Sequence, residues 1–479
     1  MTQESIGRAA VNALILEVSV TPKPGLVDRV SSGAHTDMDC ALFMKSAYSL
    51  ENYFASAAGI GFYHRKIAGK VPGSIDYGAV FADLRREGIK AEQTMNAATG
   101  GVNTHRGAVF TLGILCAAAV IAADDGGNVS AKELFAAAGR IAAFSLDDFA
   151  APDGHTFGLE LYRQTGSRGI RGEAADGYPS VSGYGLPVFS AALSSGLTLN
   201  DSALLALLIL VCVSDDTVLL KRCGGTDAAG NEKKKVRDLL SGNIGALTEK
   251  TVRLDTDWSA RGISTGGSAD LLSAVLFLSA VTGVIPAGAD AFFRVTDRIP
   301  APDTSVIDLL PDKARQFLVL ASREDRWARR RVLASLGYTV LCATAAVPHT
   351  VRYGRRVSDF VRDELNVFLT ESGLTPAFSE FLNTSDGPVF IAAFGGADAL
   401  SLKKKAAAFE DSLPARRLLD IDIMSPDGKT VSGADIGRGA RPCIVCGDSA
   451  KICMRAHAHT DGETVRAVMG LLEGQETLK

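Results

Sequence analysis

Three long stretches without a charged side chain limit what this chain can fold into. They are Gly107–Ala123, Ala203–Val213 and Leu271–Ala289. The last approaches the length of a membrane span, but it contains Ser, Thr, two Gly and Pro286 and lacks the basic flanks typical of such spans. Because a helix that is apolar on all sides must be covered all round, we expect these stretches to be buried helices of a large helical domain.

Size and composition indicate a folded protein of several domains. The 479 residues exceed one ordinary hydrophobic core, so two or three domains are expected. The apolar fraction of 47% excludes a disordered chain, and the net charge of −4 gives no signal for nucleic-acid or membrane-surface binding. The apolar run Ala9–Leu16 is too short for a secretory signal, so we expect a cytoplasmic protein whose eight cysteines are reduced.

The sequence up to about residue 290 has the pattern of an all-α domain. Apolar residues are dense over helical lengths, and strand signals are sparse. Polar, glycine-rich loops separate the predicted helices. We therefore expect an all-helical domain over residues 1–293. Its predicted helices include Asp37–Ala58, Ala79–Ala98, His105–Ala123, Ala131–Phe144, Asp201–Leu220 and Ser268–Ala280.

The character of the sequence changes after this domain. Pro300 and Pro302 indicate a linker at residues 294–308. Over residues 309–479, predicted helices alternate with predicted strands, so we expect an α/β or α+β domain. The predicted elements are the helices Asp312–Ser335 and Ala397–Asp411 and the strands Tyr338–Val347, Pro388–Ala393 and Leu418–Met424.

Charged residues recur in the polar loops of the first domain. Arg and Lys neutralise phosphate oxygens, aspartates hold Mg²⁺, and a His can act as acid or base near neutral pH. Each motif alone has a simpler explanation, because an isolated Asp-x-Asp usually caps a helix or faces solvent. Their recurrence in one helical domain indicates a site for a polyphosphate with a divalent ion. The candidates are Lys23, Arg29, His35, Asp37, Asp39, His105, Arg106, Arg168, Arg171, Asp215, Asp216 and Arg222.

Five motifs of this domain resemble those of triphosphoribosyl-dephospho-CoA synthases. They are TPKPGLVDRVSSGAHTDMD, GGVNTHRGAVF, GIRGEAADGYPSV, SDDTVLLKR and GGSADLL, in that family's order over about residues 10–285. The chain departs from the family at Val218, Cys223 and Thr265, where the family commonly has Asn, Gly and Pro.

The resemblance implies a reaction of ATP with dephospho-CoA. A ribose hydroxyl of dephospho-CoA attacks the ATP ribose carbon that carries adenine, and the triphosphate is retained. No GxxxxGK[ST] phosphate loop occurs in the sequence. The expected roles are Mg²⁺ binding or sugar stabilisation for Asp37, Asp39, Asp215 and Asp216, proton transfer for His35 or His105, and phosphate binding for Lys23, Arg29, Arg106, Arg168, Arg171 and Arg222.

Two aspartates lie two residues apart on a predicted strand of the second domain. Alternation places Asp420 and Asp422 on one face and the apolar residues on the other. Such a pair can hold metal ions for nucleotidyl transfer, as in a nucleotidyltransferase-like domain, or can form the wet face of an edge strand. Arg323, Arg326 and Arg330 share one face of the predicted basic helix, which is either solvated or a phosphate clamp.

The segment RPCIVCGDSAKICMRAHAH brings three cysteines close to two histidines in sequence. Cys443, Cys446 and Cys453 precede His457 and His459. Three thiolates and one imidazole, with His459 as the fourth ligand, suit a structural Zn²⁺. The spacing is not that of a common zinc finger, so a cluster of packed thiols is the alternative.

This segment, together with SREDR and RRLLDIDIM, resembles the phosphoribosyl-dephospho-CoA transferase that makes holo-citrate lyase. The resemblance implies that a serine of the acyl carrier subunit attacks the phosphate next to the ribose and that pyrophosphate leaves. Metal held by Asp420 and Asp422 would neutralise the developing charge, and Lys404 or Lys405 would hold pyrophosphate. Arg330 departs from this family, which tends to have Gln there.

The combined patterns predict a fused enzyme that makes a CoA-derived prosthetic group and attaches it. One rival is an Mg²⁺-dependent hydrolase of ribosyl N-glycosidic bonds, which would release adenine without dephospho-CoA. A second rival is a zinc-bearing interaction protein, which would bind the carrier subunit without chemistry.

Overall fold

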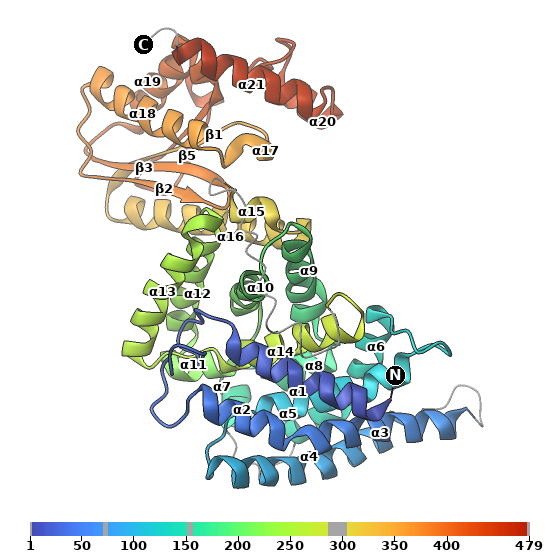
Figure 1. Ribbon diagram of the computed structural model, residues 1–479. Helices are drawn as coiled ribbons and strands as arrows, with labels where there is room; N and C mark the ends of the chain where they lie inside the picture. The colour runs from blue at the N-terminus through green and yellow to red at the C-terminus, as the bar shows by residue number, and fades with distance from the viewer. Residues whose placement is uncertain (1, 70–74, 151–156, 286–303, 477–479) are drawn as a thin grey trace. The chain divides into compact units, whose positions relative to one another are not determined.

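The chain forms two compact units, Met1–Ala314 and Arg315–Lys479. The structure is a computed structural model, and it describes residues 2–69, 75–150, 157–285 and 304–476 (Figure 1). Most of the predicted linker, residues 294–303, therefore lies outside the described residues. Its last part belongs to the first unit, because Ser305 pairs with Asn243 in a β-bridge and the amide of Val306 donates to the carbonyl of Gly242 at 3.0 Å.

Three apolar helices form the centre of the first unit, as predicted (Figure 1). They are α5 (Arg106–Ala122), α10 (Leu199–Val213) and α14 (Gly266–Val281). In α10, every residue from Ser202 to Cys212 is buried. Helix α14 packs against α5, α10 and α1 (Gln3–Ser19), which cover its sides.

Helices make up the rest of this unit, and β-pairing among its described residues is limited to isolated bridges. No helix of the described residues is long and apolar enough to cross a membrane alone; α10 with α11 passes by length and composition only as a pair bent by 70°. The further elements are α2 (Cys40–Ser49), α3 (Glu51–Ala68), α4 (Tyr77–Thr99), α6 (Ala131–Ala142), η1 (Ala143–Ala150), α7 (Phe157–Thr165), α8 (Gly169–Ala175), η2 (Val181–Gly185), α9 (Leu186–Ser194), α11 (Thr217–Cys223), α12 (Thr226–Leu240), α13 (Ile244–Arg261) and α15 (Val306–Leu309).

Two of the predicted helices are each two helices in the structure. The predicted helix Asp37–Ala58 is divided at Leu50 into α2 and α3, and α2 begins at Cys40 because the side chain of Asp39 accepts the amide of Leu42 at 2.8 Å. The predicted helix Asp201–Leu220 ends at Val213. Asp216 then starts α11 by accepting the amides of Val218 and Leu219. Capping by the carboxylate of Asp216 therefore overrides the continuous apolar pattern at the second break, whereas Leu50 at the first break has no side-chain cap.

The second unit contains a five-stranded antiparallel sheet with helices on both faces, so it is α+β. The strands are ordered β2-β3-β1-β4-β5. The strands are β1 (Tyr338–Ala345), β2 (Phe378–Thr384), β3 (Gly387–Gly395), β4 (Leu419–Met424) and β5 (Thr430–Val431); the helices are α16 (Asp312–Ser335), α17 (His349–Arg352), α18 (Arg355–Ser372), η4 (Ala415–Leu418), α19 (Ala399–Ser412), η5 (Ala434–Ile436), α20 (Ala450–Ala456) and α21 (Asp461–Glu476).

The two faces of this sheet differ in chemistry. On one face, Ile421 and Ile423 pack in the core formed with α18 and α19. On the other face, Cys342 packs with Ala334 of α16. Asp422 is the register partner of Cys342 on β1, so the predicted aspartate pair lies on the face that α16 covers.

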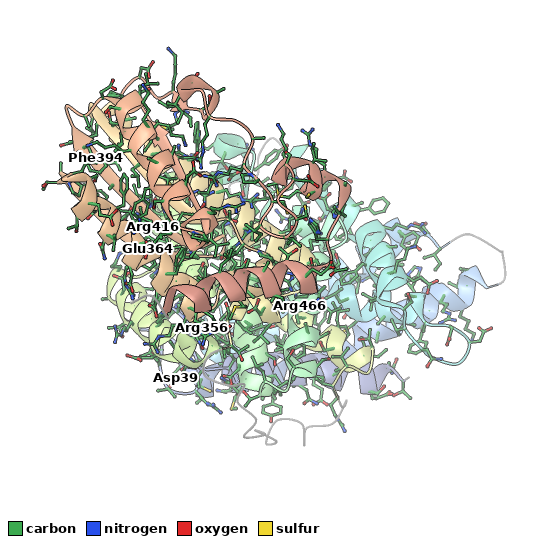
Figure 2. The ribbon with its side chains drawn as sticks, turned by 90° about the horizontal axis from the view of Figure 1, so that it is seen from above. Asp39, Arg356, Glu364, Phe394, Arg416 and Arg466 are labelled. Atoms are coloured by element: carbon green, nitrogen blue, oxygen red, sulfur yellow. The ribbon has the colours of Figure 1, made fainter. Side chains whose placement is uncertain are left out.

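A buried ion pair ties α18 to the segment that leads into β4. Arg416 donates from Nε to Glu364 at 2.7 Å, and both side chains are less than a tenth exposed (Figure 2). The guanidinium also lies 3.8 Å from the centre of the Phe409 ring, a cation–π contact. These contacts fix the start of β4, which carries the aspartates.

Close helix packing in the first unit depends on Gly61 of α3. A Cβ added there would lie 2.7 Å from the carbonyl oxygen of Ala117 on α5. We therefore expect Gly61→Ala to destabilise the first unit by about 1–3 kcal/mol through overpacking. Gly230→Ala is the matched control, because its Cβ meets nothing within 4 Å on the exposed side of α12. Chemical denaturation of both variants measures the difference, and equal stability would contradict this packing.

Candidate functional site

The opening loop, Thr21–Gly33, is folded around the carboxylate of Asp28. That carboxylate accepts hydrogen bonds from the hydroxyl of Thr21 and from the amides of Lys23, Val30 and Ser31, at 2.7–3.1 Å. Asp28 is buried, and burial of a carboxylate requires such partners. These hydrogen bonds therefore fix the conformation of the loop, and the loop positions the residues that follow it at the helical core.

Lys23 is buried and forms an ion pair with Glu17 of α1. Burial is the main cause that raises the pKa of Glu17, and the ammonium of Lys23 opposes it. A buried pair of this kind is costly to break because the remaining charge would have no partner. Lys23 thus anchors the loop to α1 while still lining the cavity described next.

A first cavity of about 360 Å³ lies where the opening loop meets the starts of α5 and α14. Lys23, His35, Asp37, His105, Arg106 and Arg222 of the predicted set line it. His35 is half-buried and contacts the hydroxyl of Ser264 at 3.1 Å through Nε2. Burial, followed by the charge of Arg222, lowers the pKa of His35.

A second cavity of about 350 Å³ adjoins the first. Arg106, Arg168, Arg171, Asp215 and Asp216 of the predicted set line it. The structure therefore brings together residues that lie more than a hundred positions apart in sequence. The residues common to both cavities are Asn103, Arg106, Gly107, Val218 and Asp270.

His105 has one satisfied and one unsatisfied ring nitrogen. Its Nδ1 lies 2.7 Å from the hydroxyl of Ser46, which itself accepts the hydroxyl of Thr104 at 2.6 Å. The Ser46 proton is then directed to Nδ1, which places the ring proton on Nε2. Nε2 is buried without a hydrogen-bond partner among the described residues. Burial, with a smaller contribution from Lys23, lowers the pKa of His105 to about 3, so the ring is neutral.

Asp215 and Asp216 already accept hydrogen bonds from the protein. Asp216 is buried and accepts the amides of Val218 and Leu219 and both the amide and hydroxyl of Ser268, at 2.8–3.0 Å. Asp215 is exposed and accepts the hydroxyl of Ser167 at 2.7 Å and the amide of Gly169 at 3.1 Å. Asp215 is therefore the more accessible oxygen donor of the two.

The cations of the second cavity are paired with nearby acids. Arg106 lies 3.1 Å from Glu92, and Arg171 lies 3.3 Å from Asp148. Arg168 pairs with Asp176. These side chains are partly exposed, so each pair contributes at most about 1 kcal/mol. Arg222, also exposed, forms no ion pair with a described residue.

Asp270 is a residue that the sequence reasoning missed, although it lies in the motif GGSADLL. It is the fifth residue of α14 and lines both cavities. Burial, followed by the charges of Glu17 and Asp216, raises the pKa of Asp270 well above its ordinary value. Its carboxylate packs against Gly107 of α5, where an added Cβ would lie 1.8 Å from Oδ2.

Two predicted residues do not line either cavity. Arg29 is exposed in the opening loop, and the side chain of Asp39 caps the N-terminus of α2. Both belong to described residues, and neither is among those that form the walls.

The aspartates of the second unit lie beside two arginines. Asp422 is 3.4 Å from Arg330 of α16, and Asp420 is 3.4 Å from Arg441. Arg330 is buried, and its Nε and one terminal nitrogen have no hydrogen-bond partner among the described residues. The face with Arg330 is therefore not simply solvated, and nothing in the sequence indicated the contact between Asp420 and Arg441.

Two further arginines of α16 and one of α17 surround a buried aspartate. Asp386 accepts hydrogen bonds from Arg323, Arg326 and Arg352, each at 3.0 Å. Three positive charges around one carboxylate leave an excess of positive charge. Asp386 lies in the turn between β2 and β3, and no motif in the sequence pointed to it.

The predicted lysines lie apart from this contact region. Lys405 donates to the carbonyl of Ser372 at 3.2 Å, and Lys404 is exposed. The neighbouring Lys403 is the lysine that reaches β4, where its Nζ donates to the carbonyl of Ile421 at 2.6 Å.

The predicted zinc ligands converge in the second unit. One ligand atom from each of Cys443, Cys446, Cys453 and His459 lies within 4.8 Å of all the others. We call these four residues the Cys₃His cluster.

Comparison with known proteins identifies both parts of the chain. Residues 3–286 match the family model of the ATP:dephospho-CoA triphosphoribosyl transferase. The chain belongs to this family. The match covers more than half of the sequence, and it contains both cavities. Residues 317–474 match the model of the apo-citrate lyase phosphoribosyl-dephospho-CoA transferase, so this family member is fused to a second transferase domain.

Relatives of the triphosphoribosyl transferase part occur in several bacteria. The probable 2-(5''-triphosphoribosyl)-3'-dephosphocoenzyme-A synthase of Pectobacterium carotovorum is 37% identical over 274 residues, which is 56% of this chain and 86% of the relative. The synthase of Pectobacterium atrosepticum is 35% identical and covered to 86% over 56% of this chain. The probable synthase of Lactiplantibacillus plantarum is 35% identical over 60% of this chain and is covered completely. The chain is a transferase.

Gly107 offers a direct test of the shared wall between the cavities. We expect Gly107→Ala to displace Asp270 and to lower adenine release from ATP and dephospho-CoA by roughly 100-fold, because a misplacement of about 1 Å has that effect on catalysis. Gly230→Ala is again the control helical glycine. Steady-state assays with both variants measure the ratio, and an undiminished rate in Gly107→Ala would contradict the proposed geometry.

The buried neutral state of His105 predicts a pH dependence of stability. A histidine whose folded pKa is about 3 contributes stability above its unfolded value near 6.5 and loses it as the pH falls. Between pH 7 and pH 5 the loss is about 2 kcal/mol. We expect His105→Gln to remove this component from the unfolding free energy of the first unit, measured by denaturant titration at both pH values. Identical pH dependence in the two proteins would contradict the burial.

Proposed function

We propose that the chain makes the prosthetic group of citrate lyase and attaches it to the acyl carrier subunit. In the first step, ATP and dephospho-CoA would form triphosphoribosyl-dephospho-CoA and adenine. The observation that carries this step is the pair of adjoining cavities, whose walls combine cations, carboxylates and histidines from the opening loop and from α5, α8, α11 and α14. The family match supports the substrate class.

The arginines of the second cavity would bind the triphosphate of ATP. Arg106, Arg168 and Arg171 hold weak, partly exposed ion pairs, which phosphate oxygens can replace at small cost. Arg222 would neutralise phosphate from the first cavity. Bound Mg²⁺ would add further charge neutralisation. Asp37 and Asp215, the exposed carboxylates of the two cavities, are the residues that would hold it.

Proton transfer would be divided between two side chains, with a third as a hydrogen-bond donor. The attacking hydroxyl of dephospho-CoA loses a proton as the C–O bond forms, and His35, half-buried in the first cavity, is positioned to accept it. The leaving adenine gains a proton as the C–N bond breaks, and Asp270, whose raised pKa favours the protonated carboxyl, would donate it. His105 would act as a hydrogen-bond donor through Nε2.

The second step would join the phosphoribosyl-dephospho-CoA group to a serine of the acyl carrier subunit with release of pyrophosphate. The match over residues 317–474 supports this assignment. We further propose that this unit acts as a nucleotidyltransferase-like domain in which Asp420 and Asp422 hold Mg²⁺ on β4. Arg330 and Arg441, which flank the aspartates, would face the phosphates.

The fused arrangement allows each step to be removed separately. We expect Asp37→Asn to lose adenine release and Asp422→Asn to keep it, because the two residues belong to different units. With apo carrier protein present, we expect Asp422→Asn to accumulate the intermediate and leave the carrier unloaded. Adenine is followed by chromatography, and the carrier is weighed by mass spectrometry.

Each variant serves as the control for the other. Purified triphosphoribosyl-dephospho-CoA, given to Asp37→Asn, should restore carrier loading to the wild-type rate. Adenine release without dephospho-CoA would instead show a hydrolase, and a carrier that binds without gaining mass would show a docking protein. Carrier loading by Asp422→Asn would disprove the role of β4.

A further inference from the structure

The backbone around Cys443 is already arranged as a metal-binding turn. The amide of Gly447 donates to the carbonyl of Cys443 at 3.0 Å, and Gly447 has a φ of +84°, which a residue with a side chain rarely adopts. The turn brings Cys446 back beside Cys443. The amide of Val445 points at the sulfur of Cys443, 3.4 Å away, as a donor that stabilises a thiolate.

The other two residues of the Cys₃His cluster come from the segment after this turn. Cys453 lies on α20, and its sulfur is 3.5 Å from that of Cys446. His459 follows after His457 ends the helix in a left-handed conformation. Nε2 of His459 is buried and has no hydrogen-bond partner among the described residues, although a buried polar nitrogen normally has one.

The dimensions and the ligand types suit one metal in particular. Ligands bound to tetrahedral Zn²⁺ at about 2.0–2.3 Å lie roughly 3.3–3.8 Å apart. The sulfur separation of 3.5 Å falls in this range, and the 4.8 Å limit on the whole cluster leaves only small adjustments. Three soft sulfur ligands with one imidazole favour Zn²⁺ over Mg²⁺ or Ca²⁺, which prefer oxygen.

The cluster is joined to β4 by contacts on its N-terminal side. Pro442 pairs with Ser449 in a β-bridge, and Arg417 donates to the carbonyl of Pro442 at 2.8 Å. Arg441, two residues before Cys443, donates to the carbonyl of Leu419 at 3.0 Å and lies 3.4 Å from Asp420. The cluster therefore follows directly after the residue, Arg441, that contacts the aspartates of β4.

We propose that the Cys₃His cluster binds one structural Zn²⁺, which holds Arg441 against the β4 aspartates. Binding replaces the thiol protons of Cys443, Cys446 and Cys453, which pass to solvent, and forms three Zn–S bonds and one Zn–N bond. The cluster belongs to the second unit and both cavities belong to the first, so we expect loss of the ion to affect the β4 site alone. This functional consequence rests on the proposed carrier-loading step, whereas zinc binding does not.

Metal analysis of the full chain tests the site without reference to activity. We expect about one zinc per chain by plasma mass spectrometry, and Co²⁺ in its place should give the absorption bands of tetrahedral thiolate coordination. His459→Ala should lose the zinc during dialysis against a mild chelator, while His457→Ala, the neighbouring exposed histidine, should retain it. Cys223→Ser, which lies in the first unit, is the control for thiol replacement.

Alkylation of the cysteine thiols tests zinc binding in the wild-type chain, so this test does not depend on the folding of a variant. In the native wild-type chain, Zn²⁺ should protect three thiols from alkylation until a strong chelator is added. A purified chain that holds no zinc and whose cluster thiols all react before any chelator is added would overturn the proposal, as would a mass two units low that marks a Cys446–Cys453 disulfide.

Activity separates the metal site from the proposed function. Removal of zinc from the wild-type chain with a chelator, followed by assay in a chelator-free buffer that contains Mg²⁺, should lower carrier loading by about 100-fold, the effect of a small misplacement of a catalytic group, and leave adenine release unchanged. Zinc that is bound and removed without any change in loading would overturn the role of Arg441 positioning. Absence of loading in the zinc-loaded wild type would instead count against the proposed second step.

Discussion

The first site depends on the hydrogen bonds that the carboxylate of Asp216 accepts. It is buried and accepts four hydrogen bonds, two from the start of α11 and two from Ser268 in the first turn of α14. One charged group therefore satisfies donors of two helix starts, whose amides otherwise have no partner. The chain bends by 70° between α10 and α11 at this point, and Asp270, two residues after Ser268 on α14, lies against Gly107 at the start of α5. Both cavities share this junction.

The apolar helices explain why the polar loops can be so irregular. α5, α10 and α14 are covered on all sides, so their ends are fixed by packing and not by the loops that follow. A rigid core of this kind holds side chains such as His105 in one orientation, because Ser46 and Thr104 are held by hydrogen bonds beside it.

The second unit orients its polar side chains through the pleat of a strand. There a pleated strand alternates Asp420 and Asp422 with Ile421 and Ile423, and the buried isoleucines determine which face the aspartates occupy.

The sequence predicted the elements whose pattern is local and missed those that depend on tertiary contacts. The buried helices and the strands β1 and β3 are rich in consecutive apolar residues, β4 alternates aspartates with isoleucines, and each was predicted within a few residues. Strand β2 was missed because its residues are mostly half-exposed and polar at the edge of the sheet. The break at Asp216 was missed because a capping carboxylate leaves no gap in the apolar pattern, and the break at Leu50 was missed because the residue there is itself apolar and has no side-chain cap. Asp270 and Arg441 were missed because each is identified only by a contact with a residue that is not adjacent in sequence. Asp270 packs against Gly107, and Arg441 lies beside Asp420.

The ion pairs of the first unit separate structural cations from those free to bind a ligand. Lys23 and Glu17 are both buried, and removing one partner of such a pair costs about 3–5 kcal/mol. Arg106 and Arg171 are partly exposed, and pairs of that kind are worth about 0–1 kcal/mol. An incoming triphosphate offers each arginine several charge-assisted hydrogen bonds at roughly twice the strength of neutral ones, which exceeds the cost of leaving Glu92 or Asp148. The same hydrogen bonds from a triphosphate do not compensate for the free energy lost when Lys23 is separated from Glu17. The cations that a ligand can recruit are therefore the exposed arginines, and Lys23, although it lies in the same cavity wall, keeps the opening loop in place.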